Sequence, residues 1–283
     1  MRSTLSRIAA VVTAGALTLT LAACGGSGSS GTSGTSGTSA AGQTLRVGTL
    51  SDAPPSIYLE NGRFTGYDNE LLRDIAKREG FEVEFVGTEF SSLLAGVAGG
   101  KFDIGSSTIS STEARKKTVA FSNGYNTGFT TVVTAKGANL KEVGALGGKR
   151  LGVVQGSVQD EFAGKVAGAQ VVRFPDYNAG FAQLKNGTLD GWVVPQDIGQ
   201  KYLDQNPGVP LELGYTVEDK DTPSAFAVAR KNTDLLNKLN DGLAKAVADG
   251  TVARIYAQFY KNTPLSKELR QGGPGLPVKN LGA

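Results

Sequence analysis

The chain has 283 residues, of which 40% are hydrophobic, enough to build two lobes of ordinary size. Its formal net charge is only +3, so the composition does not point to a nucleic acid partner. The absence of histidine excludes histidine-based catalysis and histidine metal sites, and the single cysteine excludes an intrachain disulfide bond.

The N-terminal residues have the pattern of an export signal. Arg2 and Arg7 form a short basic segment before an apolar stretch over residues 8–21, which is too short to span a membrane readily. The stretch ends in the letters LAAC at Cys24, which resembles the lipobox of bacterial lipoproteins. The pattern predicts a signal peptide over residues 1–23 and lipid (palmitate) attachment at Cys24, which would anchor the protein at the extracytoplasmic face of the cell membrane. The alternative is an ordinary secretory leader with a chance cysteine.

A tether and a first α/β unit are expected next. Residues 24–43, Cys24 and a stretch rich in glycine, serine and threonine, cannot bury apolar surface, which predicts a flexible tether. The elements expected after it are a strand over 45–48, a helix capped by Asp68 and ending before Gly80, a strand over 81–85, a helix opened by Ser91, and a strand over 102–104. Strands that alternate with helices predict a parallel sheet.

The same order of elements begins again after residue 130. The expected elements are strands over 131–135 and 150–155, a helix capped by Ser157, a strand over 171–174, a helix from Asn178, strands over 189–194 and 225–229, and helices over 234–249 and 252–260. The pattern predicts one lobe of residues 44–126 plus 231–260, a second lobe of 130–223, and an irregular tail over 261–283. A ligand is expected in the cleft between the lobes.

One segment has the chemistry of an anion site. Ser106–Thr112 is a run of hydroxyl residues after a buried strand, and Arg115 lies about one turn into the helix that follows. A carboxylate can be bound by hydroxyls and by the amides of a helix N-terminus. It also pairs well with a guanidinium, which forms two parallel hydrogen bonds to it. The alternative is a structural loop followed by a solvated helix with the charges of Arg115, Lys116 and Lys117.

Several sequence blocks together indicate a family. The blocks are Leu45–Thr49, Gly66–Asp68, Gly100–Ile104, Ser106–Arg115, Val119–Ser122, Gly148–Ser157 and Leu189–Asp190. In order and spacing they resemble the extracellular solute-binding proteins of polar amino acid ABC importers (bacterial solute-binding protein family 3), from about residue 45 to 260.

The resemblance implies a two-lobed, type II periplasmic-binding-protein fold whose chain crosses twice between the lobes. It also implies a monomer with no catalytic activity and no cofactor, which captures an amino acid or related carboxylate by hinge closure. The implied partners are an ABC permease and its ATPase in the membrane, and no nucleic acid.

The resemblance also assigns roles to individual residues. Arg115 matches the arginine that holds the ligand α-carboxylate, and Thr108 and Ser110 match positions that bind the ligand's ammonium and carboxylate groups. Phe90 matches an aromatic residue that lines the pocket, although it could instead be a core residue. Ser157 matches a helix N-terminus that completes the carboxylate cage, although it could be a plain N-cap; both can be true.

The aromatic and acidic positions of the pocket depart from the family pattern. Ala53 and Ser56 stand where the family usually has aromatic residues, and Tyr58 could replace part of that wall. Leu50 stands where some members have the acid that recognises basic side chains, which argues against lysine or arginine as the ligand. Trp192, the only tryptophan, lies in an apolar strand and is expected in the core.

The acid that pairs with the ligand's α-ammonium group is also displaced. Pro195 occupies its expected position, and Asp197, two residues further on, could replace it or could be an exposed helix cap. If no acid reaches the ammonium position, the ligand is expected to be a carboxylate without a standard α-amino group. Two other protein classes stay open: a ligand-sensing extracellular domain, and a dehydratase-like enzyme, for which the matched motifs supply no clustered pair of carboxylates.

Overall fold

The computed structural model describes residues 43–261, 263–270 and 272–281. The predicted signal peptide, Cys24 and the tether up to residue 42 lie outside these residues. Within the described part of the chain, no helix has the length and apolar character needed to cross a membrane. The described residues belong to one compact unit, which holds every element discussed below.

The first lobe is built on a five-stranded sheet. In spatial order its strands are β5 (Glu82–Gly87), β1 (Thr44–Thr49), β6 (Ile104–Gly105), β13 (Ala227–Ala229) and β7 (Val119–Phe121). β1 is parallel to β5 and β6, while β13 is antiparallel to β6 and β7. Because β13 belongs to this sheet, the first lobe resumes before residue 231.

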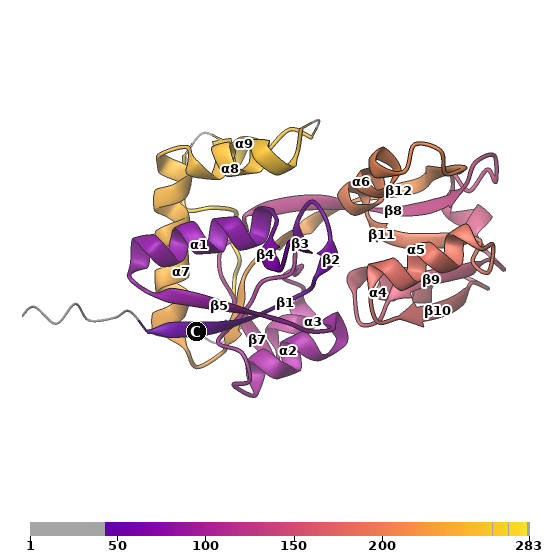
Figure 1. Cartoon of the computed structure of the whole chain (residues 1–283). Helices are drawn as coiled ribbons and strands as arrows, with labels where there is room; N and C mark the ends of the chain where they lie inside the picture. The colour runs from indigo at the N-terminus through magenta and orange to yellow at the C-terminus, as the bar shows by residue number, and fades with distance from the viewer. Residues whose placement is uncertain (1–42, 262, 271, 282–283) are drawn as a thin grey trace, which may run out of the picture. The chain divides into compact units, whose positions relative to one another are not determined.

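Helices cover both faces of the first sheet (Figure 1). They are α1 (Tyr67–Glu79), α2 (Phe90–Ala98), α7 (Thr233–Ala248) and α8 (Thr251–Phe259). Successive residues of a strand point to opposite faces, and β13 shows this clearly. Ala227 packs in the cluster beneath α2, and Val228 packs in the cluster beneath α1 and α7.

The second lobe also has a five-stranded sheet. Its spatial order is β10 (Gln170–Phe174), β9 (Arg150–Val154), β11 (Gly191–Pro195), β8 (Asn126–Ala135) and β12 (Leu211–Ser224). The helices of this lobe are α4 (Val158–Lys165), α5 (Tyr177–Lys185) and α6 (Gln196–Gln205), with a single 3₁₀ turn over Val143–Leu146. The sequence did not predict β12, because its second half is polar and has no clear alternation.

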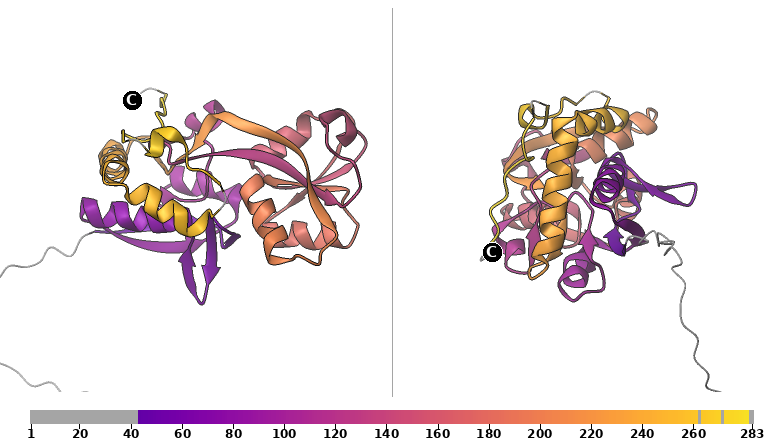
Figure 2. Two further views of the ribbon diagram at one scale, coloured as in Figure 1. Left: turned by 90° about the horizontal axis from the view of Figure 1, so that it is seen from above. Right: turned by 90° about the vertical axis from the view of Figure 1, so that its left-hand side faces the viewer.

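Two paired strands join the lobes. β8 and β12 run side by side in antiparallel register, from Ser224 opposite Asn126 to Leu211 opposite Ala135 (Figure 2). The chain therefore passes twice between the lobes. A smaller sheet, also absent from the sequence prediction, is formed by β2 (Asp52–Ala53), β3 (Ile57–Glu60) and β4 (Arg63–Thr65).

The start of α1 corrects the expected Asp68 N-cap. The N-cap is Gly66, whose φ of 106° is suited to glycine and whose added Cβ would lie 2.3 Å from the carbonyl oxygen of Ser56. Asp68 is instead buried in the first helical turn. Four other helices begin one residue earlier than expected: α2 follows Glu89, α5 follows an Asp176 N-cap, and α7 and α8 begin at residues 233 and 251.

The C-terminal tail is more ordered than the sequence indicated. It contains one helical turn, α9 (Lys267–Arg270), and Leu265 and Leu269 are buried in the core of the first lobe. Leu276 and Gly124 exchange two backbone hydrogen bonds of 2.8 and 2.7 Å. The side-chain amide of Asn280 pairs with both backbone groups of Phe121 at 2.8 Å. The tail is thus part of the first lobe.

Trp192 lies in the core of the second lobe, as expected. Its side chain is fully buried, and it meets Phe174, Tyr177 and Phe181 edge-on, with ring centroids 5.5, 6.3 and 6.2 Å away. The indole also occupies space next to Gly180, where an added Cβ would lie 2.2 Å from the ring. Trp192 is therefore the centre of this core.

Candidate functional site

A cavity of about 680 Å³ lies between the two lobes. Six of the seven residues proposed from the sequence line it: Phe90, Thr108, Ser110, Arg115, Ser157 and Asp197. Tyr58 is not among the lining residues. Its neighbour Ile57 on β3 lines the cavity, and because strand residues alternate in direction, Tyr58 faces the other way.

Arg115 is buried at the cavity wall, with 7% of its surface exposed. Its guanidinium donates from Nη1 to the carbonyl oxygen of Ser110 (3.0 Å) and from Nη2 to that of Gly156 (3.1 Å), and lies 5.1 Å from the ring centroid of Phe90. Burial lowers the pKa of Arg115 to about 10. No carboxylate of the described residues lies within ion-pairing distance of it. The solvated-helix alternative is therefore wrong.

The loop before Arg115 is fixed from behind by Asn69 of α1. The side-chain oxygen of Asn69 accepts hydrogen bonds from Ser106 (3.0 Å) and Thr49 (3.4 Å), at the ends of β6 and β1. Thr112 caps the short helix α3 (Glu113–Lys116) by accepting from the backbone N–H of Arg115. The hydroxyl run is thus anchored at both ends, which positions Arg115 toward the cavity.

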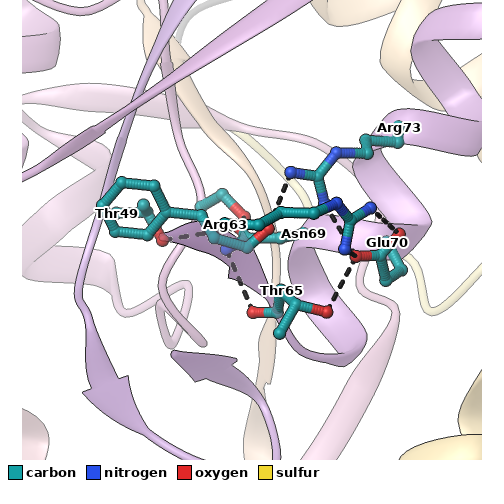
Figure 3. A network of polar contacts seen from close by, with 8 residues as sticks. Thr49, Arg63, Thr65, Asn69, Glu70 and Arg73 are labelled. Carbon is teal, nitrogen blue, oxygen red and sulfur yellow. Dashed lines mark hydrogen bonds and ion pairs between the residues drawn. The ribbon is translucent and has the colours of Figure 1, made fainter. Parts of the chain in front are cut away.

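A polar network holds the hairpin of β3 and β4 against α1. Glu70 accepts hydrogen bonds from Arg63 (2.6 and 2.9 Å), Arg73 (2.7 Å) and Thr65 (2.8 Å), as Figure 3 shows. The amide of Asn69 joins the network by donating to the carbonyl oxygen of Thr65. These contacts fix the cavity wall that follows β1.

Thr108 has an unusual backbone for its residue type, with a φ of +46°. The buried carboxylate of Asp68 holds it there, because Oδ2 accepts from the backbone N–H (2.6 Å) and the hydroxyl (3.2 Å) of Thr108. Neighbouring Ser107 also lines the cavity, and its hydroxyl is buried without a hydrogen-bond partner among the described residues. Ser107 was not proposed from the sequence, although it belongs to the hydroxyl run.

Asp68 is the acid that supports the loop. Its side chain is fully buried, Oδ2 also accepts from the hydroxyl of Tyr125 (2.7 Å), and Oδ1 has no partner among the described residues. Burial raises the pKa of Asp68 to about 7, and the hydrogen bonds only partly oppose this. The sequence pattern hid this residue, because an aspartate near a helix start is read as a cap.

The raised pKa predicts a pH dependence of stability. A carboxyl whose pKa is higher in the folded protein favours folding less as the pH rises from about 4 to about 7. We expect Asp68→Asn, which cannot ionise, to lack this decline, so that the variant gains stability relative to wild type between about pH 5 and pH 8. Urea unfolding at both pH values measures this.

A constant difference between the two proteins would contradict the Asp68 prediction. The titratable groups that interact with Asp68 are Tyr67, Tyr125, Tyr260 and Asp197. Of these, the negative charge of Asp197 raises the pKa of Asp68 further. The comparison with the asparagine variant removes the contribution of the rest of the chain from the pH profile.

Asp197 reaches the cavity from the first turn of α6, and Pro195 is the N-cap. Its Oδ2 accepts hydrogen bonds from the hydroxyls of Ser56 (2.9 Å) and Tyr260 (3.0 Å), both in the first lobe. Burial raises the pKa of Asp197, and these two hydrogen bonds oppose the rise. The exposed-cap alternative is therefore wrong, and Asp197 connects the lobes.

Tyr177, at the start of α5, lines the cavity and was missed by the sequence analysis. Burial raises the pKa of its phenol, the charges of Asp52 and Asp197 raise it further, and the charge of Arg115 lowers it. Tyr177 thus lines the same cavity as Arg115 and Asp197. It supplies an aromatic surface where Ala53 leaves the wall thin, and its position at a helix start after a strand was the available signal.

Ser157 lies on the cavity beside Gly156, which binds Arg115, whereas Asp52 is not among the lining residues. Ser157 accepts a hydrogen bond from the backbone N–H of Asp160 (3.1 Å), so it is the N-cap of α4, and it also lines the cavity; its role toward a ligand stays a prediction. Asp52 accepts from the backbone N–H of Asn178 (2.9 Å), which adds a further contact between the lobes.

The charges that line the cavity are mostly negative. Arg115 is the single cation among the described lining residues, while Asp197, Asp204 and Asp219 supply three carboxylates. Asp219 on β12 accepts from the hydroxyl of Thr130 (3.1 Å), and burial raises its pKa. Nowhere in the described chain do three or more metal-ligating side chains gather into a possible ion site.

Two α/β lobes joined by a pair of strands around a polar cavity define a two-lobed periplasmic binding protein. The sequence profile of the bacterial extracellular solute-binding proteins, family 3, matches residues 45–262. The chain belongs to this family.

Individual relatives agree with the family assignment. The chain is 31% identical to the "Probable histidine-binding protein" of Campylobacter jejuni, over 73% of this chain and 81% of that one. It is 30% identical to the ABC transporter arginine-binding protein 1 of Escherichia coli, over 78% and 92%. A solved structure of an ancestral arginine-binding protein bound to arginine has a TM-score of 0.75 at 33% identity, and covers 78% of this chain and 99% of that chain.

Proposed function

We propose that this chain is the substrate-binding lipoprotein of an ABC importer, which captures an amino acid by hinge closure and delivers it to a permease and its ATPase. Lipid attachment at Cys24 would hold it at the outer face of the membrane, and the stretch from Gly25 to residue 42 would let it reach its transporter. The proposal assigns no catalysis to the chain. Family membership supports the transport role, and the lipobox supports the anchor.

The buried, unpaired guanidinium of Arg115 is the observation that carries the ligand class. A buried cation without a carboxylate partner is costly, and a planar guanidinium pairs well with a carboxylate. The hydroxyl of Ser107, which has no partner among the described residues, and the N-terminus of α4 at Ser157 lie on the same cavity. We assign this end of the cavity to the ligand's α-carboxylate.

Asp197 is the group that we assign to the α-ammonium. It lies two residues after Pro195, the position that lacks the expected acid, and it lines the cavity. A ligand ammonium beside it would lower its raised pKa and offset the cost of its burial. This placement supports an amino acid in preference to a carboxylate without an α-amino group.

The relatives' names indicate which amino acids to test first, because they include arginine- and histidine-binding proteins. Leu50 stands in place of one acid that would recognise a basic side chain, but besides Asp197 the carboxylates of Asp204 and Asp219 line the cavity. The ligand class therefore includes basic amino acids.

A thermal-shift screen of residues 41–283 against the common amino acids and their deaminated analogues tests the function. A ligand at 100 times its dissociation constant adds about 2.7 kcal/mol to the free energy of unfolding. Stabilisation by one or a few amino acids is the expected result. Stabilisation by deaminated analogues alone would contradict the assignment of Asp197 to the α-ammonium group. If no carboxylate stabilises the protein, the proposed function is refuted.

A further inference from the structure

The cavity has a wall that the family match does not include. Thr263, Pro264 and Ser266 of the C-terminal tail line it, whereas the family profile ends at residue 262. These three residues lie three to six positions after Tyr260, whose hydroxyl binds Asp197. A segment with no counterpart in the profile therefore lies at the ligand cavity.

The tail is held firmly enough to be a fixed wall. Leu265 and Leu269 are 6% and 1% exposed within the core of the first lobe, on either side of Ser266. Further along, Leu276 pairs with Gly124 and Asn280 pairs with Phe121, both through two hydrogen bonds. Because both ends of the tail are anchored, the position of Ser266 is set by packing.

One face of α6 lines the same cavity. Gln196, Gln200 and Asp204 line the cavity at intervals of four residues, which places them on the same side of the helix. The bond between Asp197 and Tyr260 brings the start of this face next to the end of α8, where the tail begins. We call the space bordered by Gln196, Gln200, Asp204, Thr263 and Ser266 the distal subsite.

The distal subsite is rich in hydrogen-bond acceptors. The hydroxyl of Ser266 is buried without a partner among the described residues, and the carboxylate of Asp204 accepts a hydrogen bond from Gln200 (2.8 Å). Neither lysine nor arginine is found among the described residues that line this part of the cavity. A group that carries positive charge and several N–H donors matches this chemistry.

We infer that the C-terminal tail is part of the ligand site, and that with α6 it binds the cationic, donor-bearing end of the ligand's side chain. This inference rests on the proposed function. The ligand's carboxylate is assigned to Arg115 and its ammonium to Asp197, and the residues of the distal subsite line the same cavity. An amino acid with a long basic side chain offers one group to each of these three places.

Arginine and citrulline together test the inference, because citrulline has nearly the same shape as arginine but a neutral end. Isothermal titration of residues 41–283 is expected to show at least about tenfold tighter binding of arginine than of citrulline. Asp204→Asn should lower the ratio of arginine affinity to citrulline affinity about tenfold, because the substitution removes the negative charge and keeps the side-chain shape. Ser266→Ala should weaken both ligands about threefold, because both offer N–H donors to its hydroxyl.

Glu268→Gln on α9 is the matched control, since Glu268 is exposed and does not line the cavity. It should leave both affinities unchanged. The inference is overturned if wild type binds citrulline as tightly as arginine, or if Asp204→Asn and Ser266→Ala behave like the control. If wild type binds no amino acid at all, the proposed function fails and this inference fails with it.

Discussion

Replacement of Arg115 by alanine is expected to weaken amino acid binding by more than about a hundredfold, and so to abolish the ligand-induced thermal shift. The guanidinium is the only cation of the described cavity lining, and its present partners are two carbonyl oxygens. Without it, a ligand carboxylate would be buried opposite uncharged groups. Thermal shift and titration calorimetry with the ligand found by the screen measure the effect.

Arg115→Ala is expected to affect ligand binding without destabilising the folded protein. Removal of an unpaired buried cation should leave the melting temperature of the ligand-free protein equal or higher, because the cost of burying the charge disappears. Arg115→Lys should bind with intermediate affinity, since it keeps the charge but loses the planar fork. Lys117→Ala is the matched control, because Lys117 is a basic residue of the same segment but is exposed. An unchanged ligand-induced shift in Arg115→Ala would contradict the assignment.

Replacement of Trp192 by alanine is expected to lower the free energy of unfolding by about 3–5 kcal/mol. The indole is fully buried, contacts three aromatic rings, and fills the space that Gly180 leaves. Its removal would leave a cavity that the surrounding β-strands cannot close. Urea unfolding followed by circular dichroism measures the loss.

Trp192→Phe should cost much less than Trp192→Ala. Phenylalanine keeps most of the apolar contact, and the indole N–H has no hydrogen-bond partner among the described residues that would be lost. Val172→Ala on β10 is the control, because Val172 is 38% exposed, and it should cost less than about 1 kcal/mol. A loss below about 1.5 kcal/mol in Trp192→Ala would show that this core is not centred on Trp192.

The sequence predicted the parts of the fold that depend on local pattern. The apolar face of α1 and the glycines that end helices were clear signals, and the structure confirms them. β12 and the tail were not predicted, because their order comes from partners distant in sequence. β12 is stabilised by pairing with β8, and the tail by Gly124 and Phe121.

Site residues could be predicted where the residue type and its neighbours in the sequence indicate binding chemistry. They could not be predicted where only the tertiary fold brings the residue to the site. Arg115 and the hydroxyl run stood out by composition. Asp68 did not, because nothing in the sequence shows that its carboxylate lies under Thr108. Tyr177 and Ser266 come to the cavity only through the packing of the second lobe and of the tail. The binding roles of all these residues stay predictions until the ligand is measured.

The attachment of Asn280 to Phe121 also bears on self-association. β7 is an edge strand of its sheet, and an unpaired edge can recruit a strand from another molecule. At Phe121 the asparagine side chain occupies both the N–H and the C=O group of that edge. The tail therefore blocks edge-to-edge aggregation there, a protection that matters most where many copies of a protein are crowded onto one surface.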